Sequence, residues 1–334
     1  MLRLTAGLLL ATLVLLGVAP GSIAQAQTTY TLRLATWGSM THPQVVGFVP
    51  MFTKLVEERS QGRIKIQYFP GAGLVKEQDV MSAIPADVAD ISLTSLDEWS
   101  AVAPELGVFG SPLMSYDFEQ FVNVMHPGTK LFEATNAVFS SHGARLLASI
   151  DVGPSVFVSK APLEKPSDYK GKTIRVYSHA TGDLVQALGA APTQLNQNDL
   201  YAALSTGTVQ AAYGGLSGVY GAKLYEVTKY LAYPAGMFGL AINGYVMNAA
   251  KFNSLPKDLQ RIILDAATEA GTNANRTMRE AYQGQLKAMA SNGMTVTTLS
   301  SKEPGFASVA TSLKNTALEK YRSTLTTIIQ GSAP

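Results

Sequence analysis

The feature that most constrains the fold is an alternation of strand-like and helix-like segments that runs twice along the chain. In the first run, alternating apolar and polar residues predict strands at 31–36 and 63–69, and an apolar stripe of helical period predicts a helix at 44–59. A short helix at 77–84 and a short strand at 90–93 continue this order. The β-α-β-α-β order favours a mostly parallel sheet that is covered by helices.

The second run of this pattern begins midway along the chain. It predicts strands at 155–159, 172–176 and 209–213, with helices at about 181–188 and 197–205. The chain has 334 residues, which is long enough for two hydrophobic cores. We therefore expect an α/β protein with two lobes and a cleft between them.

The longest helical pattern lies in the C-terminal part of the chain. Apolar residues keep a helical period from Pro256 to about Ala290, and Asn292 with Gly293 ends the pattern. A helix of more than about 30 residues would span roughly 50 Å at a rise of 1.5 Å per residue. Because one small lobe is shorter than this, we expect the helix to brace both lobes. A further amphipathic helix is expected at about 304–329.

Residues 1–26 have the pattern of a secretory signal peptide. Arg3 precedes an apolar stretch at 8–18, and small residues at positions 24 and 26 mark a cleavage site. We expect cleavage before Gln27 and export to the periplasm. The alternative is a membrane anchor, but the stretch is shorter than the ~20 residues that a spanning helix needs. No later segment of the sequence is long and apolar enough to span a bilayer.

The composition excludes several classes of protein. With 46% hydrophobic and 15% charged residues, the chain is too apolar for a disordered protein. It has no cysteine, which excludes disulfides, thiolate nucleophiles and cysteine-ligated metal sites. Its net charge of +2 is not that of a nucleic-acid binder. Its four histidines lack metal-ligand spacing, and motifs such as G-x-S-x-G are absent. We therefore expect no metal, no cofactor, no nucleic-acid partner and no catalysis.

One charged residue lies in an apolar strand. Arg175 stands between Ile174 and Val176, and a guanidinium is seldom fully buried unless it is paired. Its planar fork matches a carboxylate through two parallel hydrogen bonds. Spacing alone does not decide whether that carboxylate belongs to the protein or to a ligand.

The segments around Arg175 form an ordered set of short motifs. They are Gly-Lys-Thr-Ile-Arg-Val at 171–176, Leu-Gly-Ala-Ala-Pro at 188–192 and the segment 199–209, with further matching segments at 60–64, 69–70, 73–74 and 255–260. Taken together, this set resembles the DctP-like solute-binding proteins of tripartite ATP-independent periplasmic (TRAP) transporters, over nearly the whole mature chain.

The resemblance implies a two-lobed fold like that of periplasmic binding proteins, with crossing hinge strands and a long helix that braces both lobes. Lobe I would hold residues 27–152 and 245–285, and lobe II would hold residues 153–244 and 286–334. Such a receptor closes on a small organic acid and delivers it to the membrane subunits of a TRAP permease. In this family the arginine of the motif binds the ligand carboxylate, a role that maps to Arg175. We expect the receptor to be a monomer.

The sequence departs from the family pattern at two places. Many members carry a second arginine near the position of Ser155, and many read Val-Asp-Gly-x-Glu-Asn where this chain has the segment 209–214. Tyr213 and Gly214 therefore stand where the family has acidic and amide groups. C4-dicarboxylates and sugar acids become less suitable ligands, and a monocarboxylate with an apolar or aromatic body is expected.

Other candidate wall residues follow from their position in the pattern. Ligand sites of α/β proteins open at the carboxyl ends of strands. The candidates follow a predicted strand, lie at a strand-to-helix turn or lie in the stretch that crosses back between the lobes. They are Trp37, His42, Thr94, Ser95, Tyr213, Phe238 and Asn243. For each of them, ordinary packing or a solvated loop is the alternative.

The expected function is that of an exported receptor that binds an organic acid and hands it to a permease. Two alternatives stay open: a secreted enzyme acting on a small organic acid, and a sensory ligand-binding protein that signals through a membrane partner. Turnover of the bound acid would favour the enzyme. A permease gene beside this one would distinguish transport from sensing.

Overall fold

The computed structural model of the chain describes residues 28–114, 118–234, 241–300 and 303–324. The predicted signal peptide, residues 1–26, lies outside the described residues. The α-helices are α1 (Pro43–Arg59), α2 (Val80–Ala83), α3 (Phe118–Val124), α4 (Lys130–Ser141), α5 (His179–Ala187), α6 (Leu200–Thr206), α7 (Leu216–Gly221), α8 (Ala249–Ser254), α9 (Lys257–Ser291) and α10 (Pro304–Lys320).

The first sheet has the strand order β2-β1-β3-β10-β4. Its strands are β1 (Tyr30–Ala35), β2 (Ile64–Phe69), β3 (Ile91–Ser95), β4 (Ala144–Asp151) and β10 (Ile242–Asn248). β1 pairs in parallel with β2 and β3, the orientation that the sequence predicts. β10 arrives from much later in the chain and pairs antiparallel with both β3 and β4.

The second sheet has the strand order β11-β9-β5-β8-β6-β7. Its strands are β5 (Ser155–Ser159), β6 (Thr173–Val176), β7 (Ala191–Gln194), β8 (Ala211–Gly215), β9 (Tyr230–Tyr233) and β11 (Thr295–Thr298). β6 pairs in parallel with β7 and β8, whereas β5 pairs antiparallel with β8 and β9.

The two-lobed α/β fold is confirmed, but both sheets are mixed where mostly parallel sheets were expected. The reason is that the chain changes sheet between β4 and β5 and returns between β9 and β10. These crossings make β10 run against β3, and β5 run against β8. The third strand of the second run is also shifted, since β8 begins at Ala211 rather than at residue 209.

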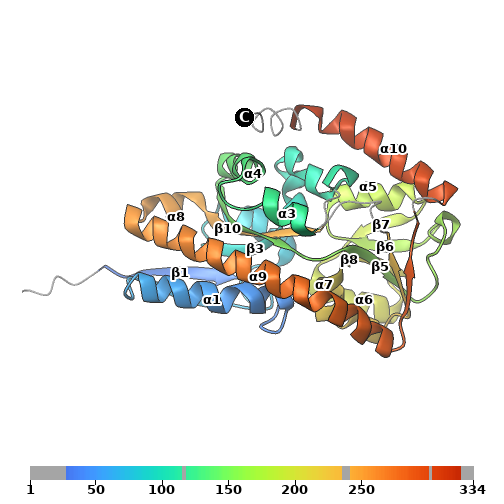
Figure 1. The fold of residues 1–334 in the computed structure, drawn as a ribbon, viewed down its shortest axis with the longest axis horizontal. Coiled ribbons are helices and arrows are strands. Elements are labelled where there is room, and N and C mark those ends of the chain that lie inside the picture. Colours follow the sequence, from blue (N-terminus) through green and yellow to red (C-terminus); the bar gives the residue numbers. More distant parts are fainter. Residues whose placement is uncertain (1–27, 115–117, 235–240, 301–302, 325–334) are drawn as a thin grey trace, which may run out of the picture.

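The long helix α9 packs against α1 and β4 of the first lobe and against α7 of the second, as expected from its length (Figure 1). Its N-terminal two-thirds contribute residues from Leu259 to Met278 to the core on the first sheet, and Met289 enters a core of the second lobe. The predicted end is confirmed, since Asn292 follows the last helical residue and Gly293 has a left-handed φ of 88°. In the described part of the chain, no helix combines the length and the apolar character needed to cross a bilayer.

Candidate ligand-binding cleft

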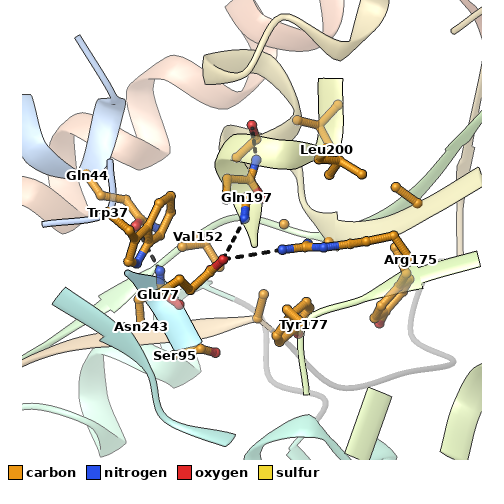
Figure 2. Close-up of a pocket in the computed structure, with 17 residues that line it drawn as sticks. Trp37, Gln44, Glu77, Ser95, Val152, Arg175, Tyr177, Gln197, Leu200 and Asn243 are labelled. Atoms are coloured by element: carbon orange, nitrogen blue, oxygen red, sulfur yellow. Dashed lines mark hydrogen bonds and ion pairs between the residues drawn. The ribbon is translucent and has the colours of Figure 1, made fainter. Parts of the chain in front are cut away.

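A cavity lies between the loops of the two sheets (Figure 2). The first lobe lines it with Trp37, Gln44, Glu77, Ser95 and Asn243, and the second lobe lines it mainly with Arg175, Tyr177, Gln197, Tyr213 and Gly214. Its volume is about 40 Å³. Sites for small molecules usually enclose about 300–1,000 Å³, so the walls must move apart to admit even a small ligand.

Arg175 is the one cation among the described residues that line this cavity. It lies on β6 and is only 2% exposed. Its Nε donates a hydrogen bond to the carbonyl oxygen of Leu195 at 2.9 Å, and the ring of Tyr177 lies 5.8 Å from the guanidinium carbon. Nη2 lies 3.5 Å from Oε2 of Glu77. Among the described residues Nη1 has no hydrogen-bond partner, so half of the fork is available to a ligand.

Glu77 is the protein carboxylate that the sequence left open as a partner for Arg175. It lies in a 3₁₀ turn, Glu77–Asp79, and its Oε2 also accepts the backbone N–H of Gln197 at 2.8 Å. Burial raises the pKa of Glu77, against the opposing effects of Arg175 and the Gln197 N–H. A strong guanidinium–carboxylate contact is about 2.7–2.9 Å long. The single 3.5 Å contact is much looser, so Glu77 does not use the full capacity of Arg175.

Two more buried acids stand beside Glu77. Asp97 accepts a hydrogen bond from Ser95 Oγ at 2.6 Å and another from the hydroxyl of Ser178, and burial raises its pKa. Burial, together with the charges of Glu77 and Asp97, raises the pKa of Glu98 well above its usual range. A second anion in this region would meet this acidic cluster without a second cation on the cavity wall.

The two family positions that differ in this chain lie next to each other beside Arg175. Burial raises the pKa of Tyr213, and its hydroxyl is hydrogen-bonded to Ser155. The rings of Tyr213 and Tyr177 are nearly parallel, with centroids 6.3 Å apart. A Cβ atom added at Gly214 would lie 3.6 Å from Arg175 Nη1. The glycine therefore leaves open the space in front of the available nitrogen, beside flat aromatic rings.

Five of the predicted site residues line the cavity together. Trp37, Ser95, Arg175, Tyr213 and Asn243 do so, and the pairing of β10 with β3 places Asn243 directly opposite Ser95.

Two predicted residues, Thr94 and His42, do not line the described cavity. The hydroxyl of Thr94 accepts a hydrogen bond from Trp99 Nε1 at 3.1 Å. His42 packs edge-on against Trp37, with ring centroids 4.8 Å apart, and burial lowers its pKa to about 4. Phe238 lies outside the described residues.

Sequence reasoning missed several residues of the wall. Glu77, Gln44, Tyr177 and Gln197 all line the cavity. Gln197 follows the carboxyl end of β7, the strand beside β6. It could have been proposed as a site residue only if β7 had been predicted from the sequence.

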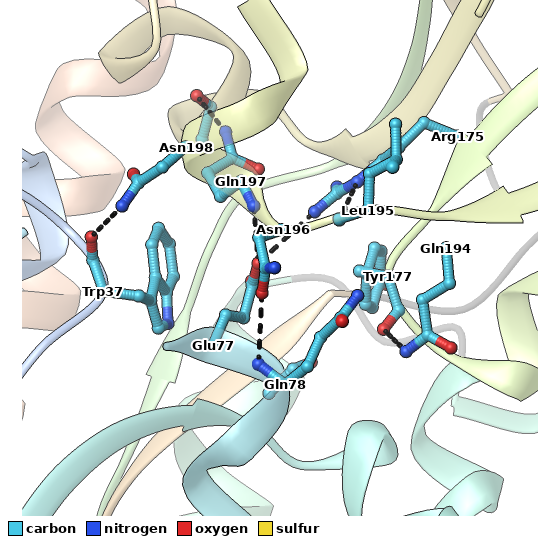
Figure 3. Close-up of polar contacts among 12 residues, drawn as sticks. Trp37, Glu77, Gln78, Arg175, Tyr177, Gln194, Leu195, Asn196, Gln197 and Asn198 are labelled. Atoms are coloured by element: carbon cyan, nitrogen blue, oxygen red, sulfur yellow. Dashed lines mark hydrogen bonds and ion pairs between the residues drawn. The ribbon is translucent and has the colours of Figure 1, made fainter. Parts of the chain in front are cut away.

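The loop after β7 joins the two lobes (Figure 3). Besides the contact of Gln197 with Glu77, Asn196 Oδ1 accepts the N–H of Gln78 at 3.4 Å, and Asn198 Nδ2 donates to the carbonyl oxygen of Trp37 at 3.3 Å. The chain therefore holds its two lobes together through direct polar contacts across the cleft.

The crossing between the sheets is tied to α9. The backbone N–H of Asp151 donates to Asn275 Oδ1 at 2.9 Å, and Asp151 Oδ1 accepts the N–H of Gly153 at 2.8 Å. Gly153 has a left-handed φ of 81°, and a Cβ there would lie 2.7 Å from a ring carbon of Tyr282. Burial raises the pKa of Asp151 to about 6. This crossing is a buried, closely packed hinge rather than a loose linker.

Sequence comparison connects the chain to known solute-binding proteins. A family profile described as bacterial extracellular solute-binding protein, family 7 (DctP), matches residues 34–316. The 2,3-diketo-L-gulonate-binding periplasmic protein YiaO of Escherichia coli strain K12 is 25% identical over 270 residues, which cover 80% of this chain and 81% of that protein. The C4-dicarboxylate-binding periplasmic protein DctP of Rhodobacter capsulatus is 26% identical over 249 residues, covering 73% of each chain.

Solved structures share the fold. A TRAP solute-binding protein from a marine metagenome, in complex with co-purified pyroglutamate, has a TM-score of 0.83 at 20% identity and covers 91% of this chain and 98% of that chain. A TRAP periplasmic solute-binding protein from Shewanella oneidensis, with bound succinate, has a TM-score of 0.82 at 21% identity and covers 92% of this chain and 100% of that chain. Since the family profile spans most of the chain, this protein belongs to family 7 of the bacterial extracellular solute-binding proteins, the DctP family of TRAP solute receptors.

Proposed function

We propose that this chain is an extracytoplasmic receptor that binds a small organic acid between its lobes and delivers it to the membrane subunits of a TRAP permease. The observation that carries this proposal is Arg175, a buried cation on the cavity wall with one side of its fork available. The ligands of the structural relatives, pyroglutamate and succinate among them, are organic acids. A carboxylate that bonds to Nη1 would form a charge-assisted hydrogen bond in a desolvated site.

The ligand we propose is a monocarboxylate with a flat, largely apolar body. Tyr177 and Tyr213 supply aromatic surface beside Arg175, and aromatic faces favour flat or apolar groups. A second carboxylate would be placed near Glu77, Asp97 and Glu98, where burial and mutual repulsion already disfavour negative charge. The diacid bound by the Shewanella relative is therefore expected to bind this chain more weakly than a monoacid.

The proposal includes how and where the receptor works. It acts in the periplasm as a monomer after removal of residues 1–26, and it binds without turnover. We keep the division expected from the sequence, with residues 27–152 and 245–285 in lobe I and residues 153–244 and 286–334 in lobe II, except at the start of β10. The strand β10 supports a return to lobe I at Ile242 rather than at residue 245, because it pairs with the first sheet from its start.

The experiment is calorimetric titration of the mature protein, residues 27–334, with a panel of monocarboxylates and diacids. We expect stoichiometric binding of a monocarboxylate that is recovered unchanged. Arg175→Ala should weaken binding by at least about tenfold, since a charge-assisted hydrogen bond is worth about 1.5–3 kcal/mol. Arg175→Lys should restore part of the affinity, because an ammonium lacks the planar fork.

Arg59→Ala is the matched control, because it also removes one guanidinium. Arg59 lies on α1 and pairs with Glu269 on α9, outside the cleft. Its loss should leave the affinity unchanged. Equal affinity of the wild type and a folded Arg175→Ala variant would remove the basis of the proposal, and conversion of the acid would favour an enzyme.

A further inference from the structure

Two buried hydrogen-bond donors on the cavity wall have no partner among the described residues. They are the indole Nε1 of Trp37 and the amide Nε2 of Gln44. Trp37 is 5% exposed and Gln44 is fully buried, and both residues line the cavity. A buried donor without an acceptor is costly, and most such groups in native proteins are paired. Two of them on the wall of one ligand cavity point to an acceptor that arrives with the ligand.

Both donors are held firmly in place. Gln44 lies in the first turn of α1, and its Oε1 accepts a hydrogen bond from Asn243 Nδ2 at 2.9 Å, which directs Nε2 elsewhere. Trp37 is fixed by its backbone contact with Asn198 and by the ring of His42, which packs against it at an interplanar angle of 71°. In Figure 2, Trp37, Gln44 and Asn243 lie on one side of Glu77, whereas Arg175 lies on the other. The donors therefore face a different part of the ligand from the part that reaches Arg175.

The chemistry of the donors limits what can bind there. An indole N–H and an amide NH₂ only donate hydrogen bonds, so a methyl or ammonium group would leave both unpaired. A second carboxylate would accept both bonds but would share the cavity wall with the buried carboxyl of Glu77. A carbonyl oxygen has two lone pairs and no charge, and it satisfies both donors without that repulsion.

We propose that Trp37 and Gln44 form a second subsite that binds a carbonyl oxygen, which makes the ligand an oxo, lactam or lactone acid rather than a plain carboxylic acid. This inference rests on the proposed function, in which Arg175 binds the carboxylate at the other end. It also explains how a cleft with one cation can select among monoacids of similar size. Trp37 and Gln44 are then specificity-determining residues.

The test uses pairs of acids that differ by one carbonyl group. The pairs are 4-oxopentanoate with pentanoate, and 5-oxotetrahydrofuran-2-carboxylate with tetrahydrofuran-2-carboxylate, with 4-hydroxypentanoate as a hydroxyl analogue. Each acid is titrated into the wild type, Trp37→Phe and Gln44→Met. In at least one pair the wild type should prefer the carbonyl acid by about tenfold, the effect of about 1.4 kcal/mol of hydrogen bonding. Each substitution should reduce that preference to less than about threefold, while the affinity for the plain acid changes little.

Trp99→Phe is the matched control, because it removes the other indole N–H of the chain. Trp99 is fully buried and donates to Thr94, away from the cavity, so the carbonyl preference should survive this substitution. Gln44→Met keeps the test decisive if Trp37→Phe does not fold.

The outcomes separate this proposal from the proposed function. Binding of both acids of every pair with equal affinity would overturn the carbonyl subsite and leave the role of Arg175 intact. So would a preference that survives in Trp37→Phe and Gln44→Met, or equal binding of 4-hydroxypentanoate and 4-oxopentanoate. Failure of the wild type to bind any of the acids would overturn both proposals.

Discussion

Arg175→Ala should weaken the fold as well as binding, because it leaves the buried carboxyl of Glu77 without its cation. Nη2 and Oε2 lie 3.5 Å apart, which corresponds to about 5 kcal/mol of gross attraction at an effective dielectric constant of about 20. Breaking a buried ion pair by removing one partner usually costs about 3–5 kcal/mol. The contact is single and long, so we expect a loss near the lower end, about 3 kcal/mol of unfolding free energy at pH 8.

The loss should depend on pH in a definite direction. Burial already raises the pKa of Glu77, and removal of Arg175 raises it further. A carboxyl whose pKa is higher in the folded than in the unfolded state contributes stability at low pH, and this stability is lost as the pH rises through the folded pKa. Arg175→Ala should therefore be less destabilising at pH 5, where Glu77 can take up a proton.

Urea unfolding without added ligand, at pH 5 and pH 8, measures this loss. Glu77→Gln keeps an oxygen that can accept the Gln197 N–H but removes the charge. Adding it to Arg175→Ala should therefore recover most of the stability lost at pH 8. An Arg175→Ala variant as stable as the wild type at pH 8, or a loss that is identical at the two pH values, would refute this reasoning.

Four further predictions concern other parts of the molecule. Burial raises the pKa of Asp151 from 3.8 to about 6, so the protein should lose up to about 3 kcal/mol of unfolding free energy as the pH rises from about 4 to 6. Urea unfolding of Asp151→Asn over the same pH range should not show this loss. Burial lowers the pKa of His42 from 6.5 to about 4, so the protein should lose about 3 kcal/mol of unfolding free energy as the pH falls through that interval. His42→Phe should not show this loss. A variant whose stability has the wild-type dependence on pH would contradict the role of His42. Intact mass of the exported protein should show Gln27 as its first residue, and a chain still starting at Met1 would exclude the cleavage. Small-angle scattering should show a smaller radius of gyration when a binding acid is added, and an unchanged profile at saturation would exclude closure.

Several of the elements that local patterns predicted are buried on one face only. The strand β1 and the helices α1 and α9 alternate or repeat with a regular period, because one face is buried and the other is not. Every residue of β10 is buried, so this strand carries no alternating pattern. Its pairing with β3 also joins residues far apart in sequence, such as Met247 and Ile91, which no local pattern reveals.

In the cleft too, a residue could be predicted where its own segment makes it unusual, but not where contacts between distant segments bury it. Arg175 stood out because a guanidinium in an apolar strand is anomalous wherever that strand packs, and the family resemblance assigned it the ligand role. Glu77 stands in the polar run Lys76-Glu77-Gln78-Asp79, which is typical of a surface turn. Its burial arises only when the loop that holds Gln197 packs against it from the other lobe. A residue buried by contact between lobes leaves no trace in the pattern of its own segment.

The arrangement of donors and acceptors explains why recognition and closure should be coupled. The cation lies on lobe II, whereas Trp37 and Gln44 lie on lobe I, so a ligand contacts both sets only when the walls are together. Glu77 already joins Arg175 to lobe I. A ligand therefore favours the closed form only by the binding free energy that its own contacts add in that form. An acid without a distal acceptor can bond to Arg175 but leaves the lobe I donors unpaired. Each additional 1.4 kcal/mol gained only in the closed form shifts the equilibrium about tenfold. We therefore expect affinity for the carboxylate and the ability to close the cleft to be separate properties of a ligand, with the second depending on Trp37 and Gln44.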